Sequence, residues 1–356
     1  MIPGRDIIVI GASAGGVEAL SQLVGQLPAD LPASIFVVLH LPVHIPSLLP
    51  QILDRRGPLP VGHPADGESI RPERIYIAPP DFHLLLEPDR IRLIRGPREN
   101  GHRPAVDPMF RSAARSFGPR VVGVVLSGTL DDGTAGLAAI KQQGGLAIVQ
   151  DPAEALYSGM PRSALESVAV DHILPVGGIA GLLDRLARQP VQVASEDEPV
   201  SQKIRKESEM AAFDMDAIED VDRPGRPSTF GCPDCGGTLW ELQAGDLVRF
   251  RCRVGHAWTA NGLLAEQSTG IETALWTALR ALEERAVLCK RVADRMRASG
   301  LETSATRFQK QASDSRQRAA ILRQVLITEP ATSDDPGSEP DLDEDDPPPA
   351  ESAANG

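Results

Sequence analysis

The first half of this 356-residue sequence predicts an α/β fold, a mostly parallel sheet with helices on both faces. Three observations favour this class. The expected strands are apolar throughout, which is typical of parallel strands that are buried on both sides. They alternate with segments whose apolar residues recur at helical spacing. Side chains able to do chemistry follow directly after several strands, where sites of open parallel sheets gather.

Residues 6–186 carry this alternation of strands and helices. The first strand is expected at 6–10, followed by a tight turn at 11–16 and a helix at 17–27 that Pro28 ends. The second strand, 34–39, is apolar and leads directly into His40. The later strands are expected at 75–77, 84–87, 90–94, 120–126 and 146–150, and the later helices at 134–143, 163–168 and 179–186.

The second half is expected to hold smaller units. Residues 1–188 are assigned to the α/β domain, and 189–228, which are polar and charged, to a linker. Residues 229–262 form a compact Cys/His segment. Residues 263–328 show two apolar stripes at alternating three and four spacing, which predicts a helical hairpin. Residues 329–356 are acidic and Pro-rich, which predicts a disordered tail.

The charge pattern excludes several classes of partner. The formal net charge is −13, but the tail holds ten acidic side chains and no Lys or Arg, so the remaining chain is nearly balanced. No basic region argues for nucleic acid. No secretory signal is evident, and no apolar run approaches the roughly 18 to 20 residues that a bilayer span needs. We therefore expect a cytoplasmic protein without membrane insertion.

The turn Gly11-Ala12-Ser13-Ala14-Gly15 fits the pattern G-x-S-x-G between a strand and a helix. Small residues allow a sharp turn that lifts a serine hydroxyl clear of the sheet. The free amides of the following helix favour a developing oxyanion. The alternative is a phosphate-binding turn, although the glycines do not match the G-x-G-x-x-G spacing of dinucleotide sites. A purely structural turn is the third interpretation.

A serine nucleophile needs a base and an acid that orients the base. His40 ends the strand that follows the serine strand, so the two strand ends are expected to be neighbours. Asp131 and Asp132 follow the strand 120–126 and offer two carboxylates. One could orient an imidazolium, and the other could cap the helix that starts near residue 134. The alternative bases are His63, His83, His102 and His172.

Three of the four cysteines lie near one histidine. Cys232 and Cys235 form Cys-x2-Cys, and Cys252 and His256 form Cys-x3-His after sixteen intervening residues. Four such ligands suit tetrahedral zinc, and a site filled by protein ligands is structural rather than catalytic. A redox Cys-x2-Cys pair and a metal-free turn are the alternatives. We expect this zinc-ribbon-like segment and the hairpin to form a binding module, and the hairpin to be a candidate dimer interface.

Six blocks of residues resemble the catalytic domain of the chemotaxis protein-glutamate methylesterases, the CheB family. The resemblance runs from about residue 6 to residue 186. The blocks are Ile10-Gly11-Ala12-Ser13-Ala14-Gly15-Gly16, Leu39-His40-Leu41-Pro42, residues 76–84 (YIAPPDFHL), residues 103–114 (RPAVDPMFRSAA), residues 126–137 from Leu126-Ser127-Gly128 to Gly136-Leu137, and Gly159-Met160-Pro161-Arg162. Thr129 and Leu130 depart from the Met-Gly that such proteins usually carry.

The resemblance implies Ser13 as nucleophile, His40 as base and Asp132 as orienting acid, since the acid in this family immediately precedes the glycine. It implies demethylation of glutamate methyl esters on methylated chemoreceptors or related signalling proteins, without a cofactor. Deamidation of glutamine is expected as a second activity. Because the serine turn begins at residue 11, we expect no receiver domain and an unknown regulator in its place. The competing functions are a catalytically weak signalling scaffold and a general small-ester hydrolase.

Overall fold

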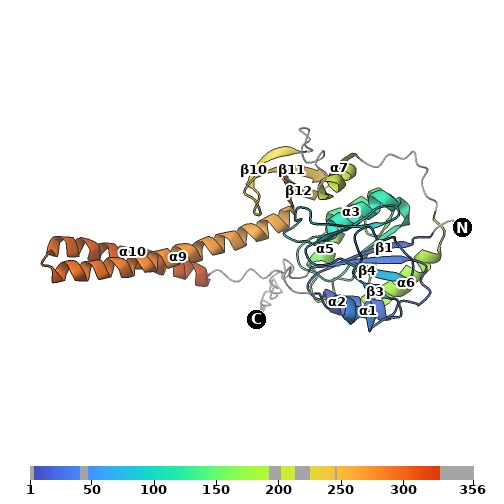
Figure 1. Cartoon of the computed structure of the whole chain (residues 1–356), viewed down its shortest axis with the longest axis horizontal. Coiled ribbons are helices and arrows are strands. Elements are labelled where there is room, and N and C mark those ends of the chain that lie inside the picture. Colours follow the sequence, from blue (N-terminus) through green and yellow to red (C-terminus); the bar gives the residue numbers. More distant parts are fainter. Residues whose placement is uncertain (1–3, 41–46, 192–201, 213–224, 245–246, 329–356) are drawn as a thin grey trace, which may run out of the picture.

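The structure is a computed structural model, and it describes residues 4–40, 47–191, 202–212, 225–244 and 247–328. It combines a sheet domain, a small four-stranded sheet and a long helical arm (Figure 1). The expected disordered tail at 329–356 lies outside the described residues, as does most of the expected linker. No helix in the described part of the chain is both long enough and apolar enough to cross a bilayer.

The central sheet has seven parallel strands in the order β3-β4-β2-β1-β7-β8-β9. Their bounds are β1 Ile7–Ala12, β2 Ser34–Leu39, β3 Val61–Gly62, β4 Arg74–Ile77, β7 Val121–Val125, β8 Leu146–Gln150 and β9 His172–Leu174. The chain runs from β1 outward to one side and returns to start β7 on the other side of β1. The strand order therefore reverses at β1, and open α/β sheets place their sites beside such a reversal.

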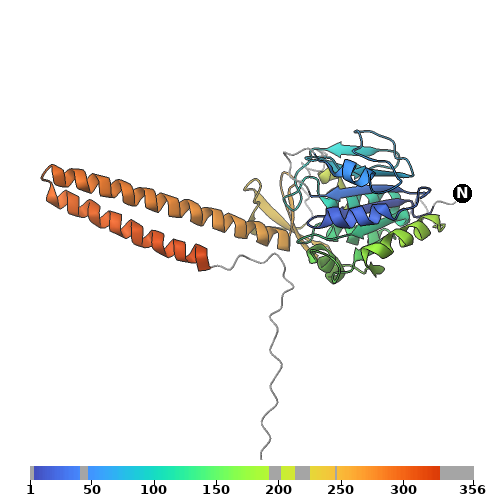
Figure 2. The same ribbon diagram turned by 90° about the horizontal axis from the view of Figure 1, so that it is seen from below.

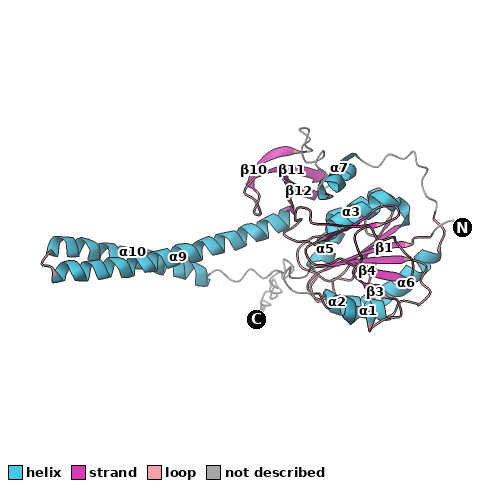
Figure 3. Cartoon of the chain, viewed as in Figure 1, coloured by secondary structure: helices cyan, strands magenta, loops and turns pink. Residues whose placement is uncertain are grey.

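Helices cover both faces of this sheet (Figure 3). One face packs against α1 Gly16–Gly25, α2 Leu49–Asp54 and α6 Val176–Arg188. The other packs against α3 Val106–Phe117, α4 Thr134–Gln142, α5 Gly159–Ser167 and the hairpin of β5 His83–Leu86 with β6 Ile91–Ile94. Apolar residues on both sides of β1, such as Ile8 and Val9, are fully buried. This two-sided burial explains why the strands are apolar throughout.

The Cys/His segment forms an antiparallel sheet of β10 Arg226–Gly231, β11 Thr238–Ala244, β12 Leu247–Cys252 and β13 Ala257–Thr259. Its core contains Phe250 and Trp258, which are 6% and 2% exposed. We call residues 225–259 the Cys/His module. It lies beside α3 together with α7, Gln202–Ala211, a helix formed within the segment that the sequence predicts to be a linker (Figure 1).

The arm consists of α9, Ala260–Ala298, and α10, Glu302–Thr328. It projects away from the sheet domain, and α10 packs back along the distal part of α9 (Figure 2). The buried residues between the helices are mainly small, and include Ala286, Ala293, Ala312 and Ala319. In α10 every residue of the predicted apolar stripe is buried or half-buried; the stripe is Ala305, Phe308, Ala312, Ser315, Ala319, Leu322 and Leu326. The stripe predicted on the first helix is exposed at Ile271 and Ala278, but buried or half-buried from Leu282 to Met296.

Candidate active site

The serine turn leaves β1 and enters α1 with a change of backbone direction at Ser13. The amide of Ser13 donates to the carbonyl of Ser127 (3.0 Å), so the turn is tied to the loop that follows β7. Gly15 has a φ of 70°, a left-handed conformation that favours glycine, and it caps α1. These constraints hold the Ser13 hydroxyl at the carboxyl end of the sheet.

Gly128 lets the loop after β7 approach the serine. A Cβ atom at this position would lie 2.9 Å from Cβ of Ser13 and 2.1 Å from Sδ of Met160. Only a residue without a side chain fits between the two. The backbone amides of Ala14 and Thr129, next to these two positions, donate no hydrogen bond to any other described residue. Both are therefore available to an oxyanion formed at Ser13.

Ser13, His40 and Asp132 form one line of hydrogen bonds, each at the end of a different strand. Nδ1 of His40 lies 3.1 Å from Oγ of Ser13, and Nε2 of His40 lies 2.8 Å from Oδ2 of Asp132. With the proton on Nε2, His40 donates to Asp132 and accepts from Ser13. The two ring nitrogens thus have exchanged places relative to the chymotrypsin arrangement, in which Nε2 faces the serine.

Asp132 is 3% exposed, and both carboxylate oxygens are satisfied. Oδ2 also accepts from the amide of Val106 (2.7 Å), and Oδ1 accepts from the amide of Asp107 (3.2 Å) and from Nδ2 of Asn100 (3.3 Å). Burial alone would raise the pKa of Asp132, but the hydrogen bond and charge of His40, with the amide of Val106, outweigh it and lower this pKa. Asp132 is therefore held as a carboxylate at the amino end of α3.

Asp131 has a different role from the one that the sequence suggests. It does not cap α4, since Gly133 is the capping residue and no side chain caps that helix. Its carboxylate instead accepts from the hydroxyl of Thr259, at 2.6 Å. Burial and the neighbouring charge of Asp132 raise the pKa of Asp131 to about 6. Asp131 thus binds the Cys/His module, whereas Asp132 faces His40.

His102 stacks on the imidazole of His40. The ring centroids are 3.7 Å apart and the planes are inclined by 15°. Burial and the charge of His40 lower the pKa of His102 to about 4, so it is neutral near pH 7. Two of the other candidate bases have structural contacts: His83 hydrogen-bonds backbone groups of Pro97 and Ala105, and His63 lies 2.9 Å from the carbonyl of Ile77. The fourth, His172, lies in β9 at the edge of the sheet.

The sequence does not predict the roles of Asn100 and Thr259, which contact Asp132 and Asp131. We call the loop after β7 that carries these two carboxylates, residues 126–133, the acid loop. Asn100 has a φ of 52° and Gly101 a φ of 75°, and the amides and carbonyls of Glu99 and His102 pair across them. Asn-Gly at the two central positions of such a hairpin is a known sequence signal. That signal could have located the turn, but not the residues that it touches.

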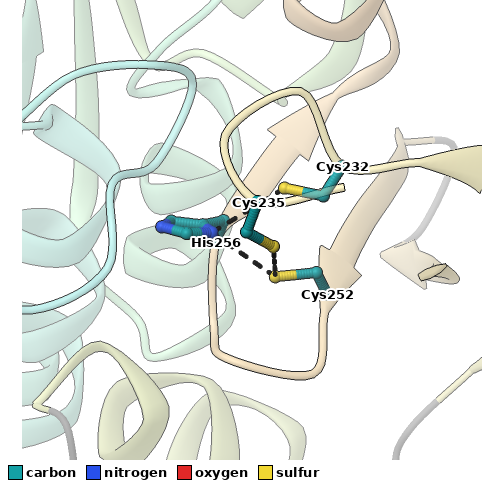
Figure 4. A group of neighbouring side chains, drawn as sticks. All are labelled: Cys232, Cys235, Cys252 and His256. Atoms are coloured by element: carbon teal, nitrogen blue, oxygen red, sulfur yellow. Dashed lines mark hydrogen bonds between the residues drawn. The ribbon is translucent and has the colours of Figure 1, made fainter. Parts of the chain in front are cut away.

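The four predicted metal ligands come together in the Cys/His module (Figure 4). Sγ of Cys235 lies 3.7 Å from Sγ of Cys252, and Nδ1 of His256 lies 3.5 Å from Sγ of Cys252 and 3.7 Å from Sγ of Cys232. A tetrahedron with zinc–sulfur bonds of about 2.3 Å has edges close to these lengths. Left-handed Gly236 and Gly255 close the two tight turns that present the ligands.

Comparison with known proteins matches residues 8–183 to the CheB methylesterase family. A putative protein-glutamate methylesterase/protein-glutamine glutaminase of Leptospira interrogans is 37% identical over 182 residues, which cover 51% of this chain and 94% of that protein. A protein-glutamate methylesterase/protein-glutamine glutaminase of Pseudomonas aeruginosa is 40% identical over 194 residues, 53% of this chain and 55% of that protein. The chain thus spans about half the length of this second relative.

A solved structure supports the same relationship. The CheB methylesterase catalytic domain of Thermotoga maritima superimposes with a TM-score of 0.50 at 36% sequence identity, and the match covers 51% of this chain and 98% of that one. The strand order, the ordered sequence blocks and these matches agree on one conclusion. The chain belongs to the CheB methylesterase family.

Proposed function

We propose that the chain is a serine hydrolase that removes methyl groups from glutamate methyl esters of chemoreceptor-type proteins. The observation that carries the proposal is the line of hydrogen bonds from Ser13 through His40 to Asp132. The three residues lie at the ends of β1, β2 and β7, which are adjacent in the sheet. The relatives' names supply the substrate class, a glutamate methyl ester.

The proposed reaction has two steps. Oγ of Ser13 attacks the ester carbonyl carbon while its proton passes to Nδ1 of His40, and the amides of Ala14 and Thr129 stabilise the oxyanion. The carbon–oxygen bond to the methoxy group breaks, and methanol leaves with the proton from His40. Water, deprotonated by His40, then attacks the acyl-enzyme and releases glutamate and free Ser13. Throughout, the Asp132 carboxylate stabilises the imidazolium.

The same acyl-enzyme would form from glutamine with ammonia as the leaving group, and the relatives' names include glutaminase. Methanol and ammonia release from methylated and amidated receptor substrates tests both activities. We expect Ser13→Ala to abolish both and to leave the fold intact. Methanol release by Ser13→Ala at the wild-type rate would contradict the assignment.

Two experiments separate the competing functions. A scaffold without chemistry would not react at Ser13 with a fluorophosphonate probe, whereas the proposed hydrolase would be labelled there and Ser13→Ala would not. A general small-ester hydrolase would cleave p-nitrophenyl acetate with a kcat/KM at least as high as that for a methylated receptor. The proposed enzyme prefers the receptor.

We also propose that the Cys/His module holds one structural zinc ion through Cys232, Cys235, Cys252 and His256. The spacing of the ligand atoms supports this, since all four lie within 4.8 Å of one another and three of the pairs are separated by 3.5 to 3.7 Å. Metal analysis of the purified full chain should find one zinc per chain, and Cys235→Ser should lower it. Cys289→Ser is the matched control, because Cys289 lies in α9 outside the cluster. A purified chain that folds with no bound metal would refute the site.

A second copy of the chain is the proposed partner of the arm. Val287 and Leu288 are 51% and 63% exposed, and they line a groove with Glu283, Glu284 and Arg291. Two α9 helices crossing antiparallel at Val287 and Leu288 would bury these side chains and set Glu284 of each copy beside Arg291 of the other. Light scattering should give a dimer mass for the wild type. A monomeric wild type, or a Val287→Glu/Leu288→Glu variant that remains dimeric, would contradict this proposal.

A further inference from the structure

A continuous chain of hydrogen bonds runs from the Cys/His module to the nucleophile. The side-chain oxygen of Asn100 accepts from the amide of Thr259 at 2.8 Å, and its side-chain nitrogen donates to Oδ1 of Asp132. From Asp132 the contacts continue through His40 to Ser13. Thr259 of the module is thus connected to Ser13 through three side chains, those of Asn100, Asp132 and His40.

The hairpin that carries Asn100 and His102 is bound to the module's sheet. The amide of Asn100 donates to the carbonyl of Ala257 (2.8 Å), and the amide of Ala257 donates to the carbonyl of Arg98 (3.2 Å). These bonds make residues 98–100 a parallel neighbour of β13. The ring of Trp258 lies 3.6 Å from the position that a Cβ on Gly101 would occupy. The hairpin therefore follows any movement of β13.

Buried charges tie the module to the sheet domain. Glu99 is 1% exposed, and its carboxylate accepts from Arg111 at 2.6 Å and from Arg251 at 2.9 Å, with Arg249 at 3.4 Å. Arg249 also pairs with Glu207 of α7. Two of the three guanidinium groups around Glu99 thus come from β12. The module therefore docks through charges that are buried and paired with the sheet domain, and removing one member of such a pair is strongly unfavourable.

The proposed metal site lies on the turn that sets these contacts. Cys252 ends β12, one residue after Arg251, and His256 precedes β13, whose last residue is Thr259. The amide of Cys252 donates to the carbonyl of His256, which closes the turn. β12 and β13 then pair Arg249 with Thr259 and Arg251 with Ala257. A metal ion on Cys252 and His256 would hold both strands in this register.

We propose that the Cys/His module is a positioning element of the hydrolase site: by holding Asn100 against Asp132, its metal-loaded β12–β13 hairpin sets the geometry of the Ser13–His40–Asp132 line. Asn100 and Thr259 are positioning residues that do not touch the substrate. The inference rests on the proposed function for its catalytic consequence. Its structural part, the coupling of metal to the acid loop, stands without any activity.

Two measurements on the full-length chain test the proposal. The first is the rate constant with which a fluorophosphonate probe labels Ser13, measured across pH. The second is hydrogen exchange of the amides of Val106 and Asp107, which donate to Asp132, with β8 as internal control. Metal removal by chelation, and Cys235→Ser, should slow labelling by about tenfold or more, since small displacements of reacting groups cost this much. Both should speed exchange at Val106 and Asp107 but not in β8.

Substitutions in the hydrogen-bond chain separate positioning from folding. Asn100→Asp keeps the acceptor for the amide of Thr259 but places a carboxylate beside Asp132, so we expect slower labelling and an altered pH profile at full metal content. The side chain of Thr259 offers a second contact with the acid loop, beside the amide that donates to Asn100. Thr259→Val removes the hydroxyl that donates to Asp131 and accepts from Gly262, and should slow labelling at full metal content. Thr259→Ser restores that hydroxyl and should return the labelling rate to within about twofold.

The possible failures are distinguishable. If the wild type is not labelled at Ser13, the proposed hydrolase is wrong, and the exchange experiment alone decides the coupling. If the wild type is labelled and the metal-free chain matches it in both rate and exchange, the coupling is wrong while the hydrolase stands. Asn100→Asp with wild-type labelling at every pH would also overturn the inference.

Discussion

The imidazole of His102 lies flat on the imidazole of His40, with ring centroids 3.7 Å apart. Its pKa is lowered from 6.5 to about 4, first by burial and then by the charge of His40. Between pH 6.5 and 4, His102 is therefore protonated in the unfolded chain but not in the folded chain. As a result, the free energy of unfolding decreases as the pH is lowered through this range. A shift of this size corresponds to about 3 kcal/mol at the acid end.

His102→Phe tests this relationship, because phenylalanine keeps a flat ring but cannot bind a proton. We expect the Tm of His102→Phe, relative to the wild type, to rise steadily as the pH is lowered from 6.5 to 4. Thermal unfolding at a series of pH values measures it. His172→Phe, in β9, is the control. A difference in Tm between His102→Phe and the wild type that stays constant over this range would contradict the lowered pKa of His102.

Asp131 and Asp132 are adjacent in sequence, but only Asp132 contacts His40. Replacing the triad acid by its amide lowers kcat by about 10⁴-fold in serine proteases. We expect Asp132→Asn to lose activity on that scale. Asp131→Asn keeps an oxygen that can accept from Thr259, so its loss should be far smaller. Methanol release by the two variants decides between them, and the opposite order would transfer the role to Asp131.

Glu99 has arginine partners from both α3 and β12. Burial would raise its pKa, but the charges of Arg111, Arg251 and Arg249 outweigh burial and hold it well below its usual range. Glu99→Ala leaves buried guanidinium groups without their carboxylate and should destabilise the fold by about 3–5 kcal/mol.

Denaturant unfolding of Glu99→Ala measures this loss. The control is Glu87→Ala, since Glu87 pairs with Arg90 at the surface and should change stability by less than about 1 kcal/mol. Equal stabilities of the two variants would show that the buried cluster contributes nothing specific.

Gly128→Ala should move the serine turn away from the loop after β7. The added methyl group would meet Cβ of Ser13 at 2.9 Å, which no rotation relieves. We expect stability to fall by about 1–3 kcal/mol, as in other overpacked sites. Because a displacement of about 1 Å can cost 10²-fold, we expect labelling of Ser13 to slow by about that factor.

Gly181→Ala is the matched control, because a Cβ at Gly181, on the exposed face of α6, meets no atom within 4 Å. It should stabilise the chain by about 0.5–1 kcal/mol through helix propensity and leave labelling unchanged. Labelling of Gly128→Ala at the rate of Gly181→Ala would contradict the steric argument.

The sequence predicts the sheet domain well because its strands are buried on both faces and therefore apolar throughout. It also places Ser13, His40 and Asp132 at strand ends, where a parallel sheet brings them together. The short elements β3, β9 and α2 are missed, since a few residues carry no periodicity. Those three short elements position none of the three residues. The helix α3 is also not among the expected helices, although the amides of Val106 and Asp107 in its first turn donate to Asp132.

The docking of the Cys/His module could not be predicted. β12 reads as an alternating strand, which would place Arg249 and Arg251 on a solvent face, yet both are 3% exposed. The segment that forms α7 is polar and therefore resembles a linker in the sequence. One of its charged residues, Glu207, is nevertheless buried against Arg249. Charged side chains that are buried by pairing across two distant segments look the same in sequence as charged side chains in water.

Helix α9 begins at the residue after Thr259, whose hydroxyl both caps the helix and touches Asp131. Its 39 residues span about 58 Å at the usual rise of an α-helix. The first residues of the arm are thus fixed inside the protein, one hydrogen bond from the acid loop, while its far end projects away from the sheet domain. A tilt that carries the far tip through several ångströms turns the first residue of the helix only slightly, so large displacements at the tip become fine adjustments beside Asp131.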